Sequence, residues 1–127
     1  MSASNYTETE WMKYAFTATA MGTRPTAWYL AVHTADPGED GTTSECAYSG
    51  YARQSIAFTQ TANQVVSNNQ QTFGAVAGGA QTITHFSVGA ASFGDKCLFV
   101  GALCLGKAFS VGDVPKFGTG EVILSVD

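Results

Sequence analysis

Short runs of alternating apolar and polar residues, separated by turn residues, constrain the fold of this chain more than any other feature. In residues 28–33 every second side chain is large and apolar, namely Trp28, Leu30 and Val32, which is typical of a half-buried strand. Similar runs recur roughly every 8 to 15 residues, near residues 52–58, 65–66, 71–76, 82–88, 97–105, 108–111 and 121–126. Glycine, asparagine and aspartate lie between them. The pattern therefore predicts a mainly β fold, either an antiparallel, jelly-roll-like β-sandwich or a barrel.

A helical pattern precedes the strands. The sequence from Thr7 to Glu10 fits a capping box, in which the two side chains bind free backbone N–H groups at a helix start. Trp11 and Ala15 follow at helical spacing, and Gly22 is a residue at which helices commonly end. We predict one α-helix at about residues 8–21, an N-terminal arm at residues 1–6 and a β-domain at about residues 26–127. Together they make a single domain, 1–127.

The composition argues against binding to nucleic acids or membranes. Only 13% of the 127 residues are charged, and the net charge is −4 with six lysines and arginines scattered along the chain. A nucleic-acid backbone requires clustered cations. The longest apolar stretch, around residues 97–105, is far shorter than the ~20 residues of a membrane-spanning helix, and the first residues do not resemble a signal peptide. We expect a soluble protein that is made in the cytoplasm.

The three cysteines, Cys46, Cys97 and Cys104, form no CxxC pair. An odd number of cysteines without a secretion signal argues against a disulfide framework. We therefore expect three reduced side chains that act as small apolar residues.

The sequence carries no motif for catalysis or cofactor binding. There is no phosphate-binding loop and no GxSxG motif, and the Gly78-Gly79 pair lies between strands. His33 and His85 could meet in space and form a site with Asp36 or a cysteine, but we interpret both as structural. The acidic residues between Asp36 and Glu45 lack the order of a calcium loop. We expect no enzymatic activity, no cofactor and no metal site.

Aromatic side chains are more abundant than a small β core requires. Most of the phenylalanines fit a core, but Tyr6, Tyr48 and Tyr51 lie in polar segments. Tyrosine and tryptophan are favoured at the centres of protein interfaces. These residues therefore indicate a protein that functions through contacts with other proteins.

Several blocks of sequence resemble a family of small tailed-bacteriophage virion proteins. The resemblance rests on WYLAVHTADPGEDG at residues 28–41 and GYARQ at residues 50–54, with further similarity at 83–89, 98–103, 111–117 and 122–127. It covers nearly the whole chain. Members are often labelled tail fibre proteins, and proteins of similar size and arrangement serve as capsid decoration, or cement, proteins. The resemblance supplies no catalytic residue.

The resemblance implies a structural role in a virion. We expect a decoration protein that binds the major capsid protein on the head exterior and bridges neighbouring capsomers, because 127 residues leave no room for a fibre shaft. By analogy it would be a homo-oligomer, with a trimer favoured. The alternative is a tail fibre or tail-associated protein that contacts the host surface. A small enzyme such as a glycan hydrolase is a third hypothesis.

Two segments are predicted to face the binding partner, because both are polar, carry aromatic residues and are expected to lie outside the core. The first is the N-terminal arm with the start of the helix, and the second is the loop 36–51. The candidate interface residues are Asn5, Tyr6, Thr7, Trp11, Asp36, Glu39, Asp40, Tyr48 and Tyr51.

Overall fold

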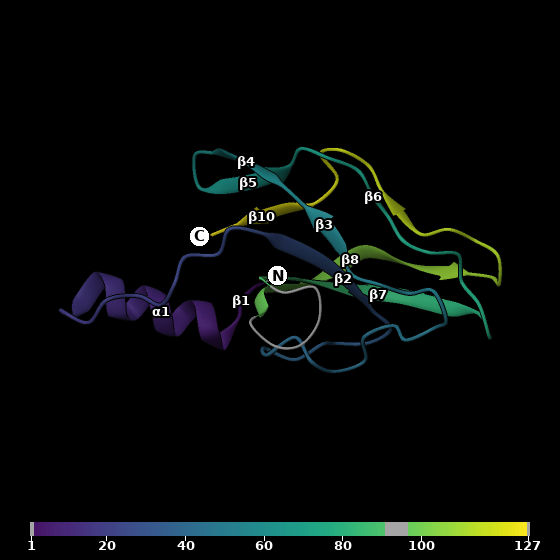
Figure 1. Cartoon of the computed structure of the whole chain (residues 1–127), viewed down its shortest axis with the longest axis horizontal. Coiled ribbons are helices and arrows are strands. Elements are labelled where there is room, and N and C mark those ends of the chain that lie inside the picture. Colours follow the sequence, from purple (N-terminus) through teal and green to yellow (C-terminus); the bar gives the residue numbers. More distant parts are fainter. Residues whose placement is uncertain (1, 91–96, 127) are drawn as a thin grey trace.

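A computed structural model describes residues 2–90 and 97–126 of the chain (Figure 1). These residues form one helix and ten strands, so the predicted mainly β class is confirmed. The elements are β1 (Ser2–Ala3), α1 (Asn5–Phe16), β2 (Trp28–His33), β3 (Gln54–Ile56), β4 (Phe58–Thr61), β5 (Gln64–Ser67), β6 (Gln71–Thr72), β7 (Gln81–Gly89), β8 (Cys97–Phe109), β9 (Lys116–Phe117) and β10 (Ile123–Ser125).

The strands are arranged in two layers, as in a sandwich. The larger layer is a five-stranded sheet in the order β1-β8-β7-β2-β3, in which every pairing is antiparallel. A three-stranded sheet, β10-β5-β4, and a two-stranded sheet, β6-β9, make up the second layer, which lies above β2, β7 and β8 in Figure 1.

One residue, Ala57, separates β3 in the first layer from β4 in the second. The chain bends there, which is how a strand changes sheets at the corner of a sandwich. The backbone at this bend is hydrogen-bonded, since the Ala57 N–H donates to the side-chain oxygen of Asn69 and the Ala57 carbonyl accepts from the N–H of Asn68. A continuous strand over 52–58 is predicted from the sequence, and the corner divides it.

The core lies between the layers. Leu30 and Val32 of β2 are completely buried, as Ile56, Phe73 and Ile83 nearly are. Aromatic rings continue the core towards the two-stranded sheet, because the ring of Phe73 stacks on Tyr51 with 5.8 Å between ring centroids and meets Phe117 edge-on. The alternation seen in residues 28–33 therefore identifies core residues correctly.

The opposite face of β2 is also buried, although a half-buried strand is expected from the sequence. Ala31 is 1% exposed and His33 is completely buried. The segment between β2 and β3 folds back over this face, with the Thr34 N–H donating to the Ser44 carbonyl and the Cys46 N–H to the Val32 carbonyl. A loop thus covers a sheet face that a period of two would leave in water.

Helix α1 begins and ends earlier than predicted. It spans Asn5–Phe16 instead of about residues 8–21, and its N-cap is Ser4, whose hydroxyl accepts from the Thr7 N–H. Within the predicted N-terminal arm, residues 1–6, Ser2 and Ala3 form β1 and pair with Val100 and Phe99 of β8. No helix in the described part of the chain is long and apolar enough to cross a membrane.

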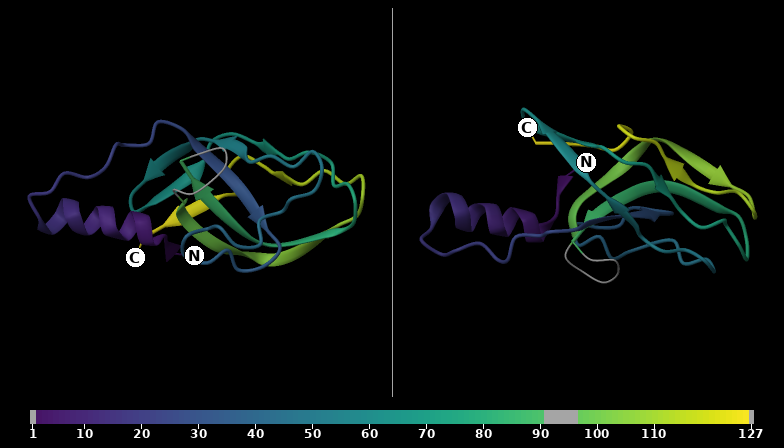
Figure 2. Two further views of the ribbon diagram at one scale, coloured as in Figure 1. Left: turned by 60° about the horizontal axis from the view of Figure 1, so that its bottom comes forward. Right: turned by 45° about the horizontal axis from the view of Figure 1, so that its top comes forward.

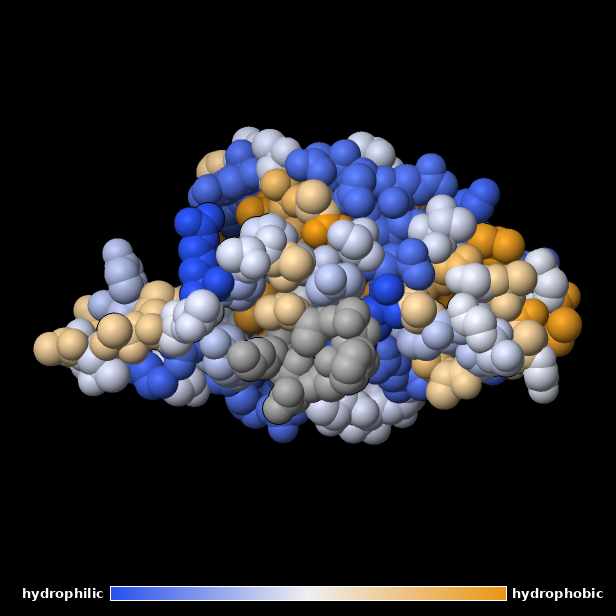
Figure 3. All heavy atoms as spheres, viewed as in Figure 1, coloured by the Kyte–Doolittle hydropathy of each residue, from blue (hydrophilic) through white to orange (hydrophobic). Residues whose placement is uncertain are grey.

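Strand β8 extends to Phe109, past the predicted end at residue 105. Within residues 2–90 and 97–126, β1 covers its outer edge only at Phe99 and Val100. Its register with β7 slips between Ile83 and His85, whose partners are Lys107 and Ala102. Leu105 in this irregular stretch is 83% exposed, and hydrophobic residues gather at the end of the molecule opposite the helix in Figure 3.

Candidate functional site

Helix α1 projects away from the β layers. Both views in Figure 2 show the helix and the segment after it as a hairpin at one end of the molecule. We call this hairpin, residues 5–25, the helical protrusion. It leaves the β-sheet at β1 and returns to it at the start of β2.

Contacts at its base attach the helical protrusion to the sheet. The Ser4 hydroxyl donates to the Cys97 carbonyl, and the Thr7 hydroxyl donates to the Leu98 carbonyl at 2.8 Å. One turn further on, the ring of Trp11 meets Phe99 edge-on with 6.3 Å between centroids. The first three residues of β8, which make these contacts, therefore fix the direction in which the helix points.

The carboxylate of Glu10 holds the two legs of the helical protrusion together. It accepts a hydrogen bond from the Gly22 N–H and one from the Lys13 ammonium group at 2.7 Å. These contacts, the backbone one first, lower the pKa of Glu10. A capping box that joins Glu10 to Thr7 is predicted from the sequence, but in the structure this carboxylate binds the returning segment instead.

Beyond Trp11 the helix presents large apolar side chains to solvent. Trp11 is 40% exposed, Met12 59%, Tyr14 76% and Phe16 75%, and Met21 on the return leg is 40% exposed. Side chains of these types are enriched in interface cores. The outer part of the helical protrusion is thus an apolar surface.

An apolar cleft separates the helical protrusion from the β4–β5–β10 sheet. Its volume is about 570 Å³, within the ~300–1,000 Å³ typical of binding pockets. A smaller hollow of about 300 Å³ continues it beneath Trp11, Val65 and Phe99. The cleft is lined by large apolar residues from both layers and both legs, among them Trp11, Met21, Trp28, Phe58, Val65 and Phe99.

The structure brings the two predicted interface segments together. At the start of the helix the Asn5 amide donates to the Asp40 carboxylate of the loop at 3.3 Å. Tyr6, Thr7 and Trp11 line the cleft. The exposed side chains of Asp36, Glu39 and Asp40 lie in the loop, where Asp36 accepts from the Gly38 N–H. Thr7 itself is 8% exposed, which leaves it little surface for a partner.

Of the predicted interface residues, Tyr48 lies in the core and Tyr51 is half-buried and packs against it. Tyr48 is 8% exposed and its hydroxyl donates to the Gly74 carbonyl, while the Tyr51 ring stacks on Phe73. The expectation that the loop 36–51 lies outside the core is therefore wrong for its last part. The sequence of this part of the loop is polar and does not reveal the burial, because the tyrosine hydroxyls donate hydrogen bonds within the protein.

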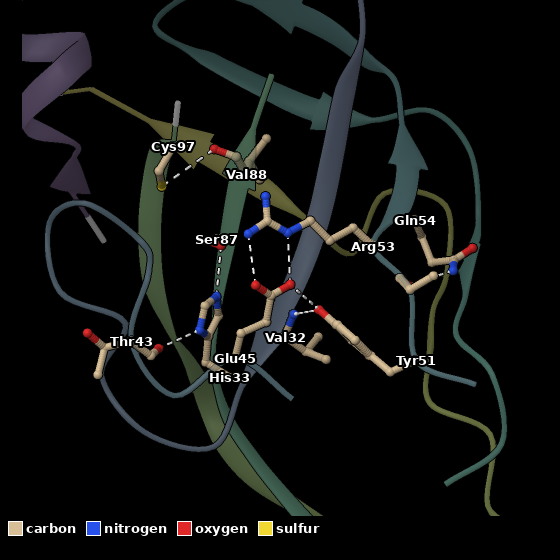
Figure 4. A network of polar contacts seen from close by, with 11 residues as sticks. Val32, His33, Thr43, Glu45, Tyr51, Arg53, Gln54, Ser87, Val88 and Cys97 are labelled. Carbon is tan, nitrogen blue, oxygen red and sulfur yellow. Dashed lines mark hydrogen bonds and ion pairs between the residues drawn. The ribbon is translucent and has the colours of Figure 1, made fainter. Parts of the chain in front are cut away.

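A polar network explains why the loop is fixed (Figure 4). The Arg53 guanidinium group donates to both carboxylate oxygens of Glu45, each at 2.8 Å, and the Tyr51 hydroxyl donates to the same carboxylate at 2.8 Å. Burial alone would raise the pKa of Glu45, but these charged and neutral donors together lower it. The network joins the loop to the segment that leads into β3.

His33 forms the second part of this network. Its Nδ1 lies 2.9 Å from the Thr43 carbonyl and its Nε2 lies 2.8 Å from the Ser87 hydroxyl. A carbonyl only accepts, so Nδ1 carries the proton and Nε2 accepts from Ser87. Burial lowers the pKa of His33, against opposing effects of the Thr43 hydrogen bond and of Glu45; Arg53 and His85 act in the same direction as burial. Both members of this Ser–His pair are buried, so a substrate has no access to them.

This geometry predicts a pH dependence of stability. The unfolded chain takes up a proton at His33 near pH 6.5, whereas the folded protein resists it, so stability falls as the pH falls through and below that value. We expect the urea midpoint of the native protein to decrease from about pH 7.5 to about pH 5.5. The decrease should be smaller in His33→Gln than in the control His85→Gln, whose ring is partly exposed. Equal slopes in the two variants would contradict this assignment.

The structure also locates the remaining candidate groups. His33 and His85 are register partners in β2 and β7, and among the described residues no group of three or more His, Cys, Asp or Glu side chains could hold a metal ion. Cys46, Cys97 and Cys104 are free thiols. Burial raises the pKa of Cys97 to about 11, which keeps this thiol protonated at neutral pH.

Met12, Tyr14, Phe16 and Met21 are absent from the predicted interface. A usable signal was present in the sequence, because Trp11, Met12, Tyr14 and Phe16 spread over a wider arc of a helix than one narrow stripe, with Lys13 on the remaining side. The helix prediction used only the stripe at Trp11 and Ala15 and left out the other apolar side chains of the segment.

Comparison with known proteins identifies the family. A search of curated proteins found no significant match. Residues 2–125 match the profile of the family described as podophage GP4 fiber I protein gp80. The match covers both layers of the sandwich and the helical protrusion. The chain therefore belongs to the podophage GP4 fiber I protein gp80 family, a family of phage virion proteins.

Proposed function

We propose that this protein is a non-enzymatic structural subunit of a fibre on a podophage virion. The observation that carries the proposal is the family match over residues 2–125, whose description names a fibre protein. It favours the tail-fibre alternative of the sequence analysis over capsid decoration. The chain supplies a stiff β body with a helical protrusion at one end, an arrangement suited to a subunit that is attached at that end.

The physical character of the surface supports a role in contacts. Charged residues make up 13% of the chain, so polar uncharged side chains dominate the surface and little charge has to be desolvated on binding. The largest exposed aromatic side chains lie on the helical protrusion. A subunit held by such contacts needs no catalytic group, and the Ser–His pair is enclosed within the fold.

The experiment is to locate the protein in purified virions. Antibody–gold labelling should mark the tail region, and the copy number on a stained gel should be a small fraction of that of the major capsid protein. Labelling spread over the whole head at near-capsid copy number would instead support decoration through the major capsid protein and overturn the fibre proposal. Antiserum absorbed with the purified protein is the matched control.

A further inference from the structure

The outer half of helix α1 is apolar on two opposite sides. Trp11 faces the cleft and touches Phe99. Met12 and Phe16 are displaced from it by about 100° and 140° around the helix axis, and they lie one turn apart on the other side. Both are more than half exposed. A surface helix normally keeps one side polar, so this helix is built to be covered on the side that faces away from its own sheet.

Nothing in the described part of the chain covers Met12 and Phe16. The contacts with the sheet are made at the start of the helix, by Ser4, Thr7 and Trp11. The helix has 12 residues, and an isolated helix of this length is marginal in water. A second molecule that covered these two side chains would therefore stabilise the helix.

The same chain has, beside the helix, a cleft that can accommodate such side chains. The cleft has apolar walls formed by Trp28, Phe58 and Val65 and a volume of about 570 Å³, room for large apolar groups. Every copy carries both the apolar side chains and the cleft at the same end. The side chains of one copy can therefore occupy the cleft of another. A closed ring of identical contacts then leaves no cleft empty.

Charge supports the same occupant. Glu8 is exposed one turn before Met12, on the same side of the helix, and Arg24 is exposed at the rim of the cleft. Within residues 2–90 and 97–126 neither has an ion-pair partner in its own chain. An approach of Met12 and Phe16 to a neighbouring cleft brings Glu8 near the neighbour's Arg24, and the pair of opposite charges favours that contact.

A lipid surface fits less well. Helices that lie on membranes are rich in lysine and arginine on their polar side. Here the helix carries Glu8 and Glu10 against one cation, Lys13, which is already bound to Glu10. The charge of the helix thus favours a protein partner that supplies a cation.

From these contacts we propose that the protein self-associates through the helical protrusion, with Met12 and Phe16 of one copy seated in the apolar cleft of a second copy. The contact includes an ion pair between Glu8 and the Arg24 of the neighbour. This surface goes beyond the fibre proposal and does not depend on where in the virion the protein resides.

The test is the mass of the purified full chain in solution, measured by sedimentation or light scattering. The native protein should form a multiple of the 13.3 kDa chain. Met12→Gln/Phe16→Gln keeps good helix formers and should weaken association at least about tenfold. The matched control is Leu105→Thr/Val111→Thr, which removes equally exposed apolar groups at the opposite end and should keep the native mass.

Charge reversal separates the ion pair from helix stability, because Glu8→Arg also places a cation in the first turn of the helix, a loss that a change at Arg24 cannot repair. Glu8→Arg and Arg24→Glu should each weaken association, and the double reversal should restore it. A native protein that is monomeric at the highest concentration reached would overturn the proposal. So would dissociation by the Leu105/Val111 control alone, or binding to neutral phosphatidylcholine vesicles that the Met12/Phe16 variant abolishes without any change in mass.

Discussion

Replacing Leu30 with alanine is expected to lower the free energy of unfolding by about 3–5 kcal/mol. Leu30 is completely buried in the middle of β2, between the partner strands β3 and β7, where it pairs with Gln54 and Val88. Strands on both sides prevent the surroundings from collapsing into the space that the side chain leaves. The loss therefore includes the cavity as well as the transfer of the side chain.

The measurement is urea unfolding at one fixed protein concentration, because association would otherwise contribute to stability. Leu105→Ala is the matched control, since Leu105 is 83% exposed and should change stability by no more than about 0.5 kcal/mol. If Leu30→Ala does not fold, the milder Leu30→Met should still lose stability, by less than about 1.5 kcal/mol. Equal losses at the two leucines would show that β2 is not central to the core.

Removing the charge of Glu45 is expected to produce the second largest loss. Glu45→Gln keeps the size of the side chain but replaces the carboxylate by a neutral amide, so the Arg53 guanidinium group, whose side chain is 9% exposed, loses its two charge-assisted hydrogen bonds to Glu45. Breaking one side of a buried pair costs about 3–5 kcal/mol. The Glu45 side chain is 24% exposed, so we expect about 2–3 kcal/mol here.

The pH dependence of this loss separates it from a packing effect. The folded pKa of Glu45 lies below its ordinary value of 4.5, so its contribution is present above that pH and is lost as the pH falls through the folded pKa. The difference between native protein and Glu45→Gln should therefore shrink in acid. The control is Glu39→Gln in the same loop, where the side chain is exposed. A difference that stays constant down to acid unfolding would contradict the role assigned to the ion pair.

The sequence predicts the elements whose burial is decided locally. The alternation in residues 28–33 identifies β2 and its buried residues Leu30 and Val32, and similar runs locate β7 and most of β8. In β2 the large apolar side chains Leu30 and Val32 point between the two layers, and a period of two records which side that is. The one-residue corner at Ala57 does not show in such a pattern because the bend depends on a turn at Asn68 and Asn69.

The helix start shows how a contact distant in sequence decides between two local possibilities. Both Ser4 and Thr7 are suitable N-cap residues. Ser4 becomes the cap because its hydroxyl also reaches the Cys97 carbonyl, 93 residues further along the chain. Glu10 is then free to bind Gly22. A capping motif alone carries no information on such a partner.

The candidate site was predictable only in part. Asn5, Tyr6 and Trp11 do lie at the base of the helical protrusion, as the polar and aromatic character of that segment indicates. Tyr48 is buried and Tyr51 half-buried, because the Gly74 carbonyl and the Glu45 carboxylate accept hydrogen bonds from their hydroxyls within the fold. The cleft itself arises where the helical protrusion approaches the β layers, which no linear pattern encodes.

The irregular register of β8 affects how readily copies of the protein aggregate at high local concentration. A long, straight and apolar edge strand would act as a template for endless strand addition by other chains. The slip between Ile83 and His85, together with the charge of Lys107, interrupts that template after a few residues. The open edge is thereby protected from amyloid-like polymerisation, even at the local concentrations that a particle imposes on its subunits.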